Sequence, residues 1–269
     1  MSTISMNASA TGMSALNTQL EVIANNLANA NTTGFKRFRC NLEDLAYIEK
    51  RQPGVESQVI DATRPTGLFV GLGCEVAATQ QDHMSGSALP TGNPLDVMIT
   101  GNGFLRVSIG DLGANGIGYT RAGNLTLNQD GRLVMANSTG YAIEPEIVIP
   151  QEALNVNIES TGRVTYSLVD DPDLVEAGTI ETSTFQNPAG LKPIGENLFV
   201  ETYASGTENI GQPGTDGRGQ LRSGHLEGSN VDPVIELVDL IRTQRSFEMN
   251  SQALKAADET LRTAVNLAR

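Results

Sequence analysis

The chain has 269 residues and a formal charge of −13, from 31 acidic and 18 basic side chains, so binding to bare nucleic-acid phosphates is excluded. No apolar run approaches the roughly 20 residues of a membrane span, and the N-terminus lacks the basic and apolar regions of a cleavable secretory signal. Trp is absent, and seven Phe and five Tyr are too few to suggest one large aromatic-rich enzyme core.

The two ends of the chain differ in composition from its middle. All 11 prolines lie between Pro53 and Pro233, and the last glycine is Gly228. Residues 1–35 contain one charged side chain, and residues 231–269 contain five basic and six acidic ones. Residues 36–230 contain 13 basic and 24 acidic side chains, a balance of −11. This partition predicts two nearly neutral helical ends around an acidic middle.

The N-terminal segment repeats apolar residues every seven positions, with a further apolar or small residue three positions later. This spacing predicts a helix with a heptad seam. Its other faces consist of Ser, Thr, Asn and Ala, which suits contact with further protein better than contact with water or lipid. The candidate assembly residues of this segment are Met13, Leu16, Leu20, Ile23, Asn26 and Leu27.

The C-terminal segment repeats the pattern over a longer range. From Val234 to Arg269 it contains neither Gly nor Pro, which permits a helix of about 54 Å. Asp232 and Pro233 are typical of an N-cap followed by the first helical residue. The candidate assembly residues of this segment are Leu240, Phe247, Leu254, Ala257 and Leu261.

Heptads at both ends predict that the terminal helices pair as a coiled coil. The alternative is that each helix packs separately on a globular core. A neutral two-helix pair would be incomplete alone, so we expect it to gain buried area from copies of the same chain.

The middle of the chain is predicted to form short antiparallel strands. Apolar runs alternate with turn residues every 8 to 15 positions, which favours an all-β domain over βαβ units. We therefore expect an α+β protein with three parts: a terminal helical domain (1–35 and 231–269), a connecting segment with an inserted loop (36–75) and a β-rich outer domain (76–230). The expected strands are 96–99, 104–109, 119, 125–127, 133–135, 147–149, 156–158, 164–168, 179–185 and 198–202, with a loop over 205–224.

No catalytic, metal-binding or cofactor-binding site is predicted. His83 and His225 are about 140 positions apart and have no third ligand at metal spacing. The run from Asn128 to Gly131 resembles part of a calcium loop, but a hairpin turn is favoured because Asn137 stands where glutamate is required. The acidic group Asp170, Asp171 and Asp173 is interpreted as a solvated turn.

Cys40 and Cys74 flank the predicted inserted loop, and two readings stay open. A disulfide between them would close the base of the loop and contribute about 3 to 4 kcal/mol. Alternatively, both are half-buried thiols that act as small apolar residues.

Several motifs resemble those of bacterial flagellar basal-body rod and hook proteins. They are Asn25-Asn26-Leu27-Ala28-Asn29, Thr33-Gly34-Phe35-Lys36, Thr91 to Asp96, Gly101 to Phe104, Tyr119 to Gly123 and Glu227 to Val231. The resemblance covers essentially the whole chain. The length, the middle segment and the run from Ala253 to Asp258 are most similar to the distal rod class. Proximal rod or hook-class axial subunits are the alternative, and a secreted β-rich adhesin or a peptidoglycan enzyme is less favoured.

The resemblance implies a structural subunit that polymerises into a rigid helical tube and transmits motor torque to the hook. It implies homo-oligomeric contacts together with proximal rod proteins, hook protein or hook-side axial subunits, surrounding basal-body ring proteins and the flagellar export apparatus. The implied location is the periplasmic rod of the basal body, reached without a cleavable signal. No nucleic acid and no membrane span are expected.

The segment from Asp44 to Leu72 lies where distal rod proteins carry an inserted loop. Its rod-type residues are Gln52, Pro53, Gly54, Arg64 and Pro65. The resemblance implies that this loop reaches a neighbouring subunit and keeps the rod straight. The alternative reading is a mobile surface loop.

Overall fold

The computed structural model describes residues 2–53, 56–57, 60–63, 66–110, 116–168 and 174–267. They form two compact units. Unit 1 contains the described parts of 2–28, 38–80 and 232–267, and unit 2 contains those of 29–37 and 81–231. One long helix lies at each end of the sequence, with mainly antiparallel strands between them. The predicted α+β class is therefore confirmed.

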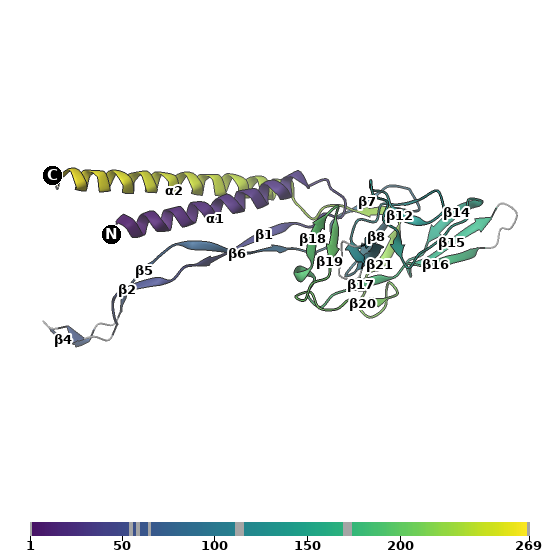
Figure 1. The fold of residues 1–269 in the computed structure, drawn as a ribbon, viewed down its shortest axis with the longest axis horizontal. Helices are drawn as coiled ribbons and strands as arrows, with labels where there is room; N and C mark the ends of the chain where they lie inside the picture. The colour runs from purple at the N-terminus through teal and green to yellow at the C-terminus, as the bar shows by residue number, and fades with distance from the viewer. Residues whose placement is uncertain are drawn as a thin grey trace. The chain divides into compact units, whose positions relative to one another are not determined.

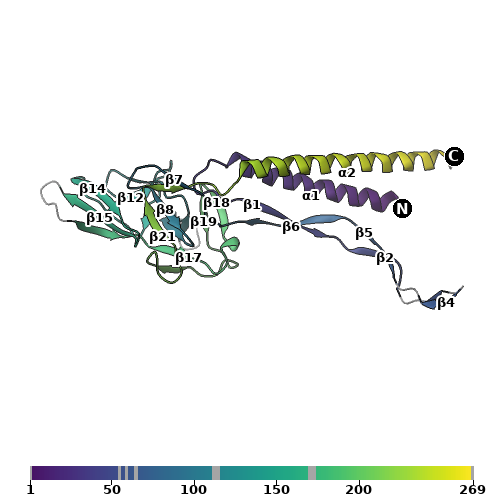
Figure 2. The ribbon, with the colours of Figure 1, turned by 180° about the vertical axis from the view of Figure 1, so that it is seen from behind.

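Two antiparallel helices dominate unit 1 and lie side by side (Figures 1 and 2). They are α1 (Ser2–Ala28) and α2 (Pro233–Leu267). The predicted start of α2 is confirmed, since Asp232 Oδ1 accepts hydrogen bonds from the backbone N–H groups of Val234 (2.9 Å) and Ile235 (3.4 Å). Within the described residues, no helix combines the length and the apolar composition needed to cross a bilayer.

A long two-stranded hairpin completes unit 1 (Figure 1). Its ladders pair β1 with β6, β2 with β5 and β3 with β4. Gly73 lies against α1 with φ +120°, and a Cβ atom there would clash with the Thr11 hydroxyl. The bounds are β1 (Phe38–Asp44), β2 (Tyr47–Arg51), β3 (Glu56–Ser57), β4 (Ile60–Thr63), β5 (Leu68–Gly71) and β6 (Cys74–Gln81).

Unit 2 is built from short antiparallel strands. A seven-stranded sheet has the order β18-β19-β10-β9-β17-β20, and β13 also pairs with β9. Beside it are a three-stranded sheet, β14-β15-β16, and the pairs β11-β12, β21-β8 and β22-β7. The bounds are β7 (Ala88–Pro90), β8 (Val97–Thr100), β9 (Phe104–Ser108), β10 (Ile117–Thr120), β11 (Leu125–Leu127), β12 (Leu133–Met135), β13 (Ile143–Glu144), β14 (Ala153–Ile158), β15 (Arg163–Leu168), β16 (Val175–Thr179), β17 (Thr182–Thr184), the 3-10 helix η2 (Pro188–Gly190), β18 (Lys192–Gly195), β19 (Leu198–Val200), β20 (Asn209–Gly211), β21 (Gln220–Ser223) and β22 (His225–Glu227).

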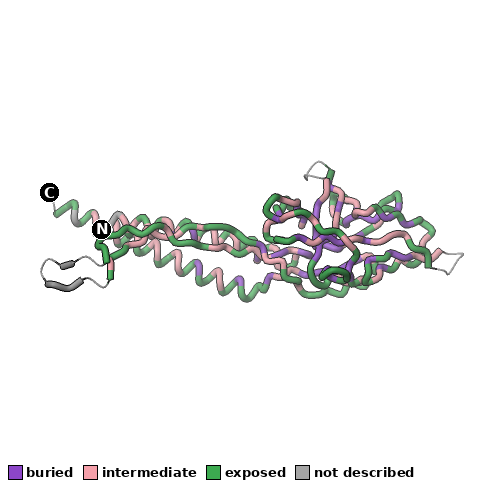
Figure 3. Tube along the Cα trace, turned by 90° about the horizontal axis from the view of Figure 1, so that it is seen from below, coloured by how far each residue is buried: buried purple, intermediate pink, exposed green. Residues whose placement is uncertain are grey.

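Unit 2 carries an extensive hydrophobic core, whereas unit 1 does not. Two clusters of buried side chains lie in unit 2, one mainly aliphatic and one aromatic around Phe104, Tyr119 and Phe199. Among the described residues of unit 1, the buried apolar side chains are Ala15 and Ile23. Figure 3 shows this contrast, with most of the buried positions in the strands of unit 2.

The observed strands agree with most of the expected ones, and the differences have local causes. Residues 147–149, expected as a strand, form only a bridge at Val148, between two prolines at 145 and 150. The expected strand 179–185 is divided between β16 and β17. The expected loop 205–224 contains β20 and β21, whose few residues are held by pairing with β17 and β8. The N-terminal part of the expected helical domain, 1–35, is helical only as far as Ala28, where α1 ends.

The cysteines are both free and half-buried. The backbone bonds Leu45 N–H to Gly73 O (2.9 Å) and Asp82 N–H to Arg37 O (2.9 Å) fix the antiparallel ladder of β1 and β6. In this ladder Cys74 faces the end of β1, about four positions and roughly 13 Å from Cys40. Since a disulfide requires Cα atoms within about 7 Å, the two-thiol reading describes this conformation.

Candidate functional site

The predicted seam residues of α2 are partly covered within the single chain. Leu240, Phe247, Leu254, Ala257 and Leu261 are half-buried in the single chain. Glu236 and Thr243, which continue the same heptad spacing, are buried at 2% and 4% exposure. A Cβ atom on Gly12 of α1 would lie 3.2 Å from the Asn250 amide nitrogen of α2, so the two helices approach closely there.

The candidate residues of α1 divide into two groups by burial. Ile23 and Asn26 are buried, whereas Met13, Leu16, Leu20 and Leu27 are half-buried. Gly12 and Ala15 are also buried, although the apolar pattern does not include them. The buried positions of α1 thus include two small residues as well as Ile23 and Asn26, and the other large apolar side chains remain partly accessible.

A second apolar surface on α2 was not predicted from the heptads. Five side chains in the first third of the helix are exposed by 42% to 69%, although all are large and apolar. Their spacing of three and four positions would have indicated this stripe beside the seam. They are Val234, Ile235, Leu237, Val238 and Ile241, here called the α2 apolar stripe.

Asn26 joins three elements of unit 1. Its amide Nδ2 donates to the Phe38 carbonyl (2.8 Å) and to Glu236 Oε2 (3.3 Å), and its Oδ1 accepts from the Phe38 N–H (2.9 Å). The side chain is 1% exposed, so these bonds satisfy a buried amide. One residue thus connects α1 with the start of β1 and the first turn of α2, where the helix dipole also favours the Glu236 carboxylate.

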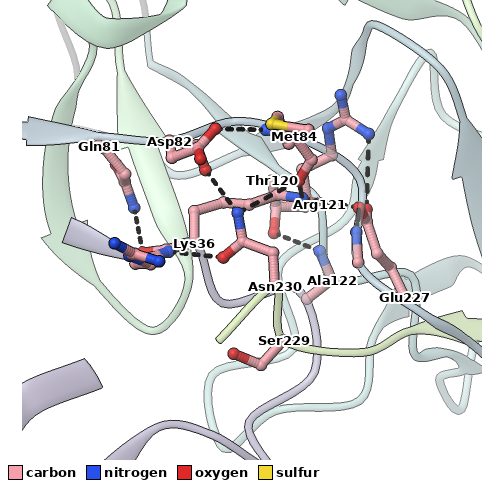
Figure 4. A network of polar contacts seen from close by, with 12 residues as sticks. Lys36, Gln81, Asp82, Met84, Thr120, Arg121, Ala122, Glu227, Ser229 and Asn230 are labelled. Atoms are coloured by element: carbon pink, nitrogen blue, oxygen red, sulfur yellow. Dashed lines mark hydrogen bonds and ion pairs between the residues drawn. The ribbon is translucent and has the colours of Figure 1, made fainter. Parts of the chain in front are cut away.

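A buried ion cluster, here called the Glu227 cluster, lies in unit 2 (Figure 4). Lys36 Nζ donates to Glu227 Oε1 at 2.6 Å and to the Met84 carbonyl at 2.7 Å. Arg121 Nη1 lies 3.5 Å from Glu227 Oε2, and the Gly86 N–H donates to Oε1 at 3.0 Å. The side chains of Lys36 and Glu227 are fully inaccessible to solvent and Arg121 is 2% exposed.

Further bonds hold the connector, residues 29–37, along its length. Gly34 N–H donates to the Glu227 carbonyl (2.8 Å), and at φ +71° a Cβ atom would lie 2.7 Å from the Ala122 nitrogen. The side chain of Asn197 donates to the Thr33 carbonyl (2.8 Å), and the Arg37 N–H donates to Asn230 Oδ1 (2.7 Å). The motif residues Thr33 to Lys36 therefore serve as an anchor within unit 2.

Burial controls the protonation of two groups in this region. It lowers the pKa of Lys36, and the attraction of Glu227 opposes that shift only in part. The pKa of His83 is lowered to about 4, because burial, and then the positive charges of Arg121 and Lys36, disfavour the imidazolium. His83 is consequently neutral at physiological pH.

The remaining predicted residues have these positions. Gln52 and Pro53 are exposed on the hairpin, while Gly54, Arg64, Pro65, Asp170, Asp171 and Asp173 lie outside the described residues. Asn128 Oδ1 accepts from the N–H groups of Asp130 (3.0 Å) and Arg132 (2.9 Å), which confirms a hairpin turn. His225 Nδ1 contacts the Ser223 carbonyl at 3.0 Å. In the described part of the chain, no three His, Cys, Asp or Glu residues are grouped at metal-binding distance.

Replacing Lys36 by Met is expected to lower the free energy of unfolding of unit 2 by about 3 kcal/mol, because buried Glu227 would lose its shortest ion pair and keep only the 3.5 Å contact with Arg121. The matched control is Arg262→Met, which removes an exposed ion pair with Asp258 (3.0 Å) and should cost less than about 0.5 kcal/mol. Urea unfolding at pH 7, followed by circular dichroism, measures both. Equal losses in the two variants would contradict an anchoring role for the cluster.

His83 makes stability depend on pH. Between pH 6.5 and about 4 the unfolded chain binds a proton at this position more tightly than the folded chain does. The free energy of unfolding should therefore fall as the pH is lowered through this window, by up to about 3 kcal/mol from His83. His83→Gln should flatten that part of the pH profile, whereas His225→Gln should retain it. Parallel profiles for His83→Gln and the parent would refute the assignment.

Comparison with known proteins agrees with the resemblance along the whole sequence. Residues 6–36 match the family model described as flagella basal body rod protein. Residues 98–166 match the D1 domain of the flagellar hook protein FlgE/F/G, and residues 222–267 match the C-terminal model of flagellar basal body rod FlgEFG protein. The three matches include the connector, the central strands of unit 2 and most of α2.

Curated relatives cover nearly the full length. The chain is 44% identical over 250 residues to the flagellar basal-body rod protein FlgG of Agrobacterium fabrum, which covers 93% of this chain and 94% of that protein. It is 40% identical over 262 residues to the FlgG of Borreliella burgdorferi, with 97% of each covered. The flagellar hook-basal body complex protein FlhP of Bacillus subtilis is 29% identical over 269 residues, with 96% of each covered. The chain therefore belongs to the family of flagellar basal-body rod proteins, as a structural subunit of the rod.

Proposed function

We propose that the chain polymerises through unit 1 into a rigid helical tube, the distal rod, which transmits motor torque to the hook. The observation that carries this proposal is the small buried core of unit 1. The two helices have 27 and 35 residues. Within the described part of unit 1, the buried apolar residues are Ala15 and Ile23. Burial of two such side chains offsets little of the cost of ordering these helices, so neighbouring subunits must supply the rest.

The pairing of α1 and α2 is proposed to be a coiled coil. The contacts Asn26 to Glu236 and Gly12 to Asn250 are separated by 14 residues on each helix (26 − 12 and 250 − 236). Fourteen residues are two heptads, so the helices keep the same register between these contacts. The half-buried seam residues and the α2 apolar stripe would then contact other copies of the chain.

The hairpin is proposed to bridge neighbouring subunits and to resist sliding between them. Tyr47 and Phe69 are 59% and 53% exposed on β2 and β5, where a two-stranded ladder cannot cover them. Gln52 and Pro53, with Gly54, Arg64 and Pro65, belong to the same contact in this proposal. In this proposal each of the three parts has one role. Assembly belongs to the terminal helical domain (1–35 and 231–269), bridging to the connecting segment (36–75) and the outer surface to the β domain (76–230).

The proposed partners are proximal rod proteins on one side, hook protein or hook-side axial subunits on the other, and surrounding basal-body ring proteins. The proposed location is the periplasmic part of the basal body, reached through the flagellar export apparatus without a cleavable signal. We propose no catalytic activity. The buried polar side chains, such as Asn26, Lys36 and Glu227, hold parts of the chain together, and the heptad residues pack the helices.

Replacing Ile241 by Asp tests assembly through the α2 apolar stripe. Ile241 is 48% exposed in the single chain, so the monomer should fold, whereas a charge buried against a neighbour should abolish polymerisation. The matched control is Val148→Asp in unit 2, at a side chain that is 49% exposed. Sedimentation and electron microscopy measure filament formation, and circular dichroism monitors the fold. Normal filaments from Ile241→Asp would remove the stripe from the interface.

Shortening the hairpin tests the bridging role. The Leu72 N–H donates to the Ala46 carbonyl at 3.2 Å, so replacing residues 47–71 by Asn-Gly can close the ladder with a two-residue turn. This variant should still assemble but give curved or more flexible filaments, which electron microscopy can measure as a shorter persistence length. Filaments as straight as those of the parent would exclude a stiffening role.

A further inference from the structure

A pocket of about 430 Å³ opens in unit 2, within the range of small-molecule sites. It is lined in part by Phe104 and Phe185, whose rings meet edge to face at 5.9 Å between centroids. His83 packs edge-on to Phe104 at 5.5 Å, and its lowered pKa keeps it uncharged. These rings, which are steeply inclined to one another, provide an apolar wall that offers both ring faces and ring edges.

Arg121 gives the pocket a buried cation that has unused hydrogen-bonding capacity. Its guanidinium lies 5.3 Å from the centre of the Phe104 ring and is 2% exposed. A guanidinium has five N–H donors. Among the described groups, Nη1 has a single long bond to Glu227 (3.5 Å), and Nε has no partner.

The surrounding carboxylates compensate the charge of Arg121 only weakly. Glu227 lies 2.6 Å from Lys36 but 3.5 Å from Arg121, and Asp82 adds a second negative charge that acts on Lys36. Asp216, an acidic residue of the pocket lining, is paired with Arg218 at 3.1 Å. Asp82 is half-buried and accepts the Met84 N–H at 3.0 Å.

We propose that this pocket binds a carboxylate carried on a flat apolar group, with Arg121 receiving the carboxylate and Phe104 and Phe185 contacting the apolar part. Planar, two-point hydrogen bonding suits guanidinium and carboxylate. The carboxylate belongs either to a free organic acid or to an acidic side chain of a neighbouring copy. Arg121 also contacts Glu227, so a bound carboxylate would compete with Glu227 for the guanidinium and alter the cluster that holds the connector.

Titration of the full-length monomer with benzoate, followed by ligand-observed NMR, tests the pocket. Benzoate should bind at least tenfold more tightly than the neutral analogue benzamide. Gln186 is an exposed residue of the lining, so Gln186→Trp should obstruct the pocket and weaken benzoate binding at least tenfold. The matched control is Gln129→Trp, at an exposed residue elsewhere in unit 2, which should bind like the parent.

Arg121→Gln should also lose at least tenfold in benzoate affinity, and Gln186→Trp keeps the test decisive if that buried substitution prevents folding. Equal binding of benzoate and benzamide, or equal binding by Gln186→Trp and Gln129→Trp, would overturn the proposal.

Repeating the titration on assembled filaments separates the two sources, and this step alone rests on the proposed function. Retained binding identifies a free acid as the occupant, whereas loss on assembly identifies a side chain of a neighbouring copy. Failure to form filaments would count against the proposed function and leave the monomer result unaffected.

Discussion

The position of the connector depends on the buried ion pair between Lys36 and the Glu227 carboxylate. This pair brings Lys36 into contact with a residue 191 positions later in the sequence. Closing so long a loop costs conformational entropy, and burying both charges adds a desolvation cost, which the lowered pKa of Lys36 reflects. The cluster therefore contributes little net stability. It instead fixes the register of the connector against unit 2, because a shift of one residue would separate the buried charges.

Unit 1 relies on the opposite principle. Its anchor is the neutral side-chain amide of Asn26. The Nδ2 and the Oδ1 of this amide both form hydrogen bonds. Its helix α2 leaves large apolar side chains exposed, most of them in the α2 apolar stripe. A unit of this kind has little stability to lose by exchanging internal contacts for contacts with neighbours, which suits a polymerising surface better than a closed core would.

The sequence predicted the elements of the fold where a local pattern controls them. The heptads and the Asp232 cap give α2 its start and its packed face, and turn residues give most strands of unit 2. The packing of α1 was less predictable, because Gly12 and Ala15 are buried through backbone approach, which an apolar pattern does not record. The Glu227 cluster was not predictable from charge, since nothing in the sequence indicates that Lys36 and Glu227, 191 positions apart, would meet. The one local signal was a lysine that directly follows a 35-residue segment with a single charge.

Each unit has its own polar anchor, at the point where its elements begin or end. Asn26 fixes where α1 ends and where β1 and α2 begin, and the connector that follows it is held at Thr33, Gly34, Lys36 and Arg37. The chain passes between the two units after residues 28, 37, 80 and 231, and the connector spans the first two of these crossings. Directional hydrogen bonds and a buried ion pair resist displacement more steeply than apolar contacts, which can slide with little loss of area. The burial of polar groups at the connector and the exposure of apolar groups on α2 therefore give these two parts of the chain different resistance to displacement.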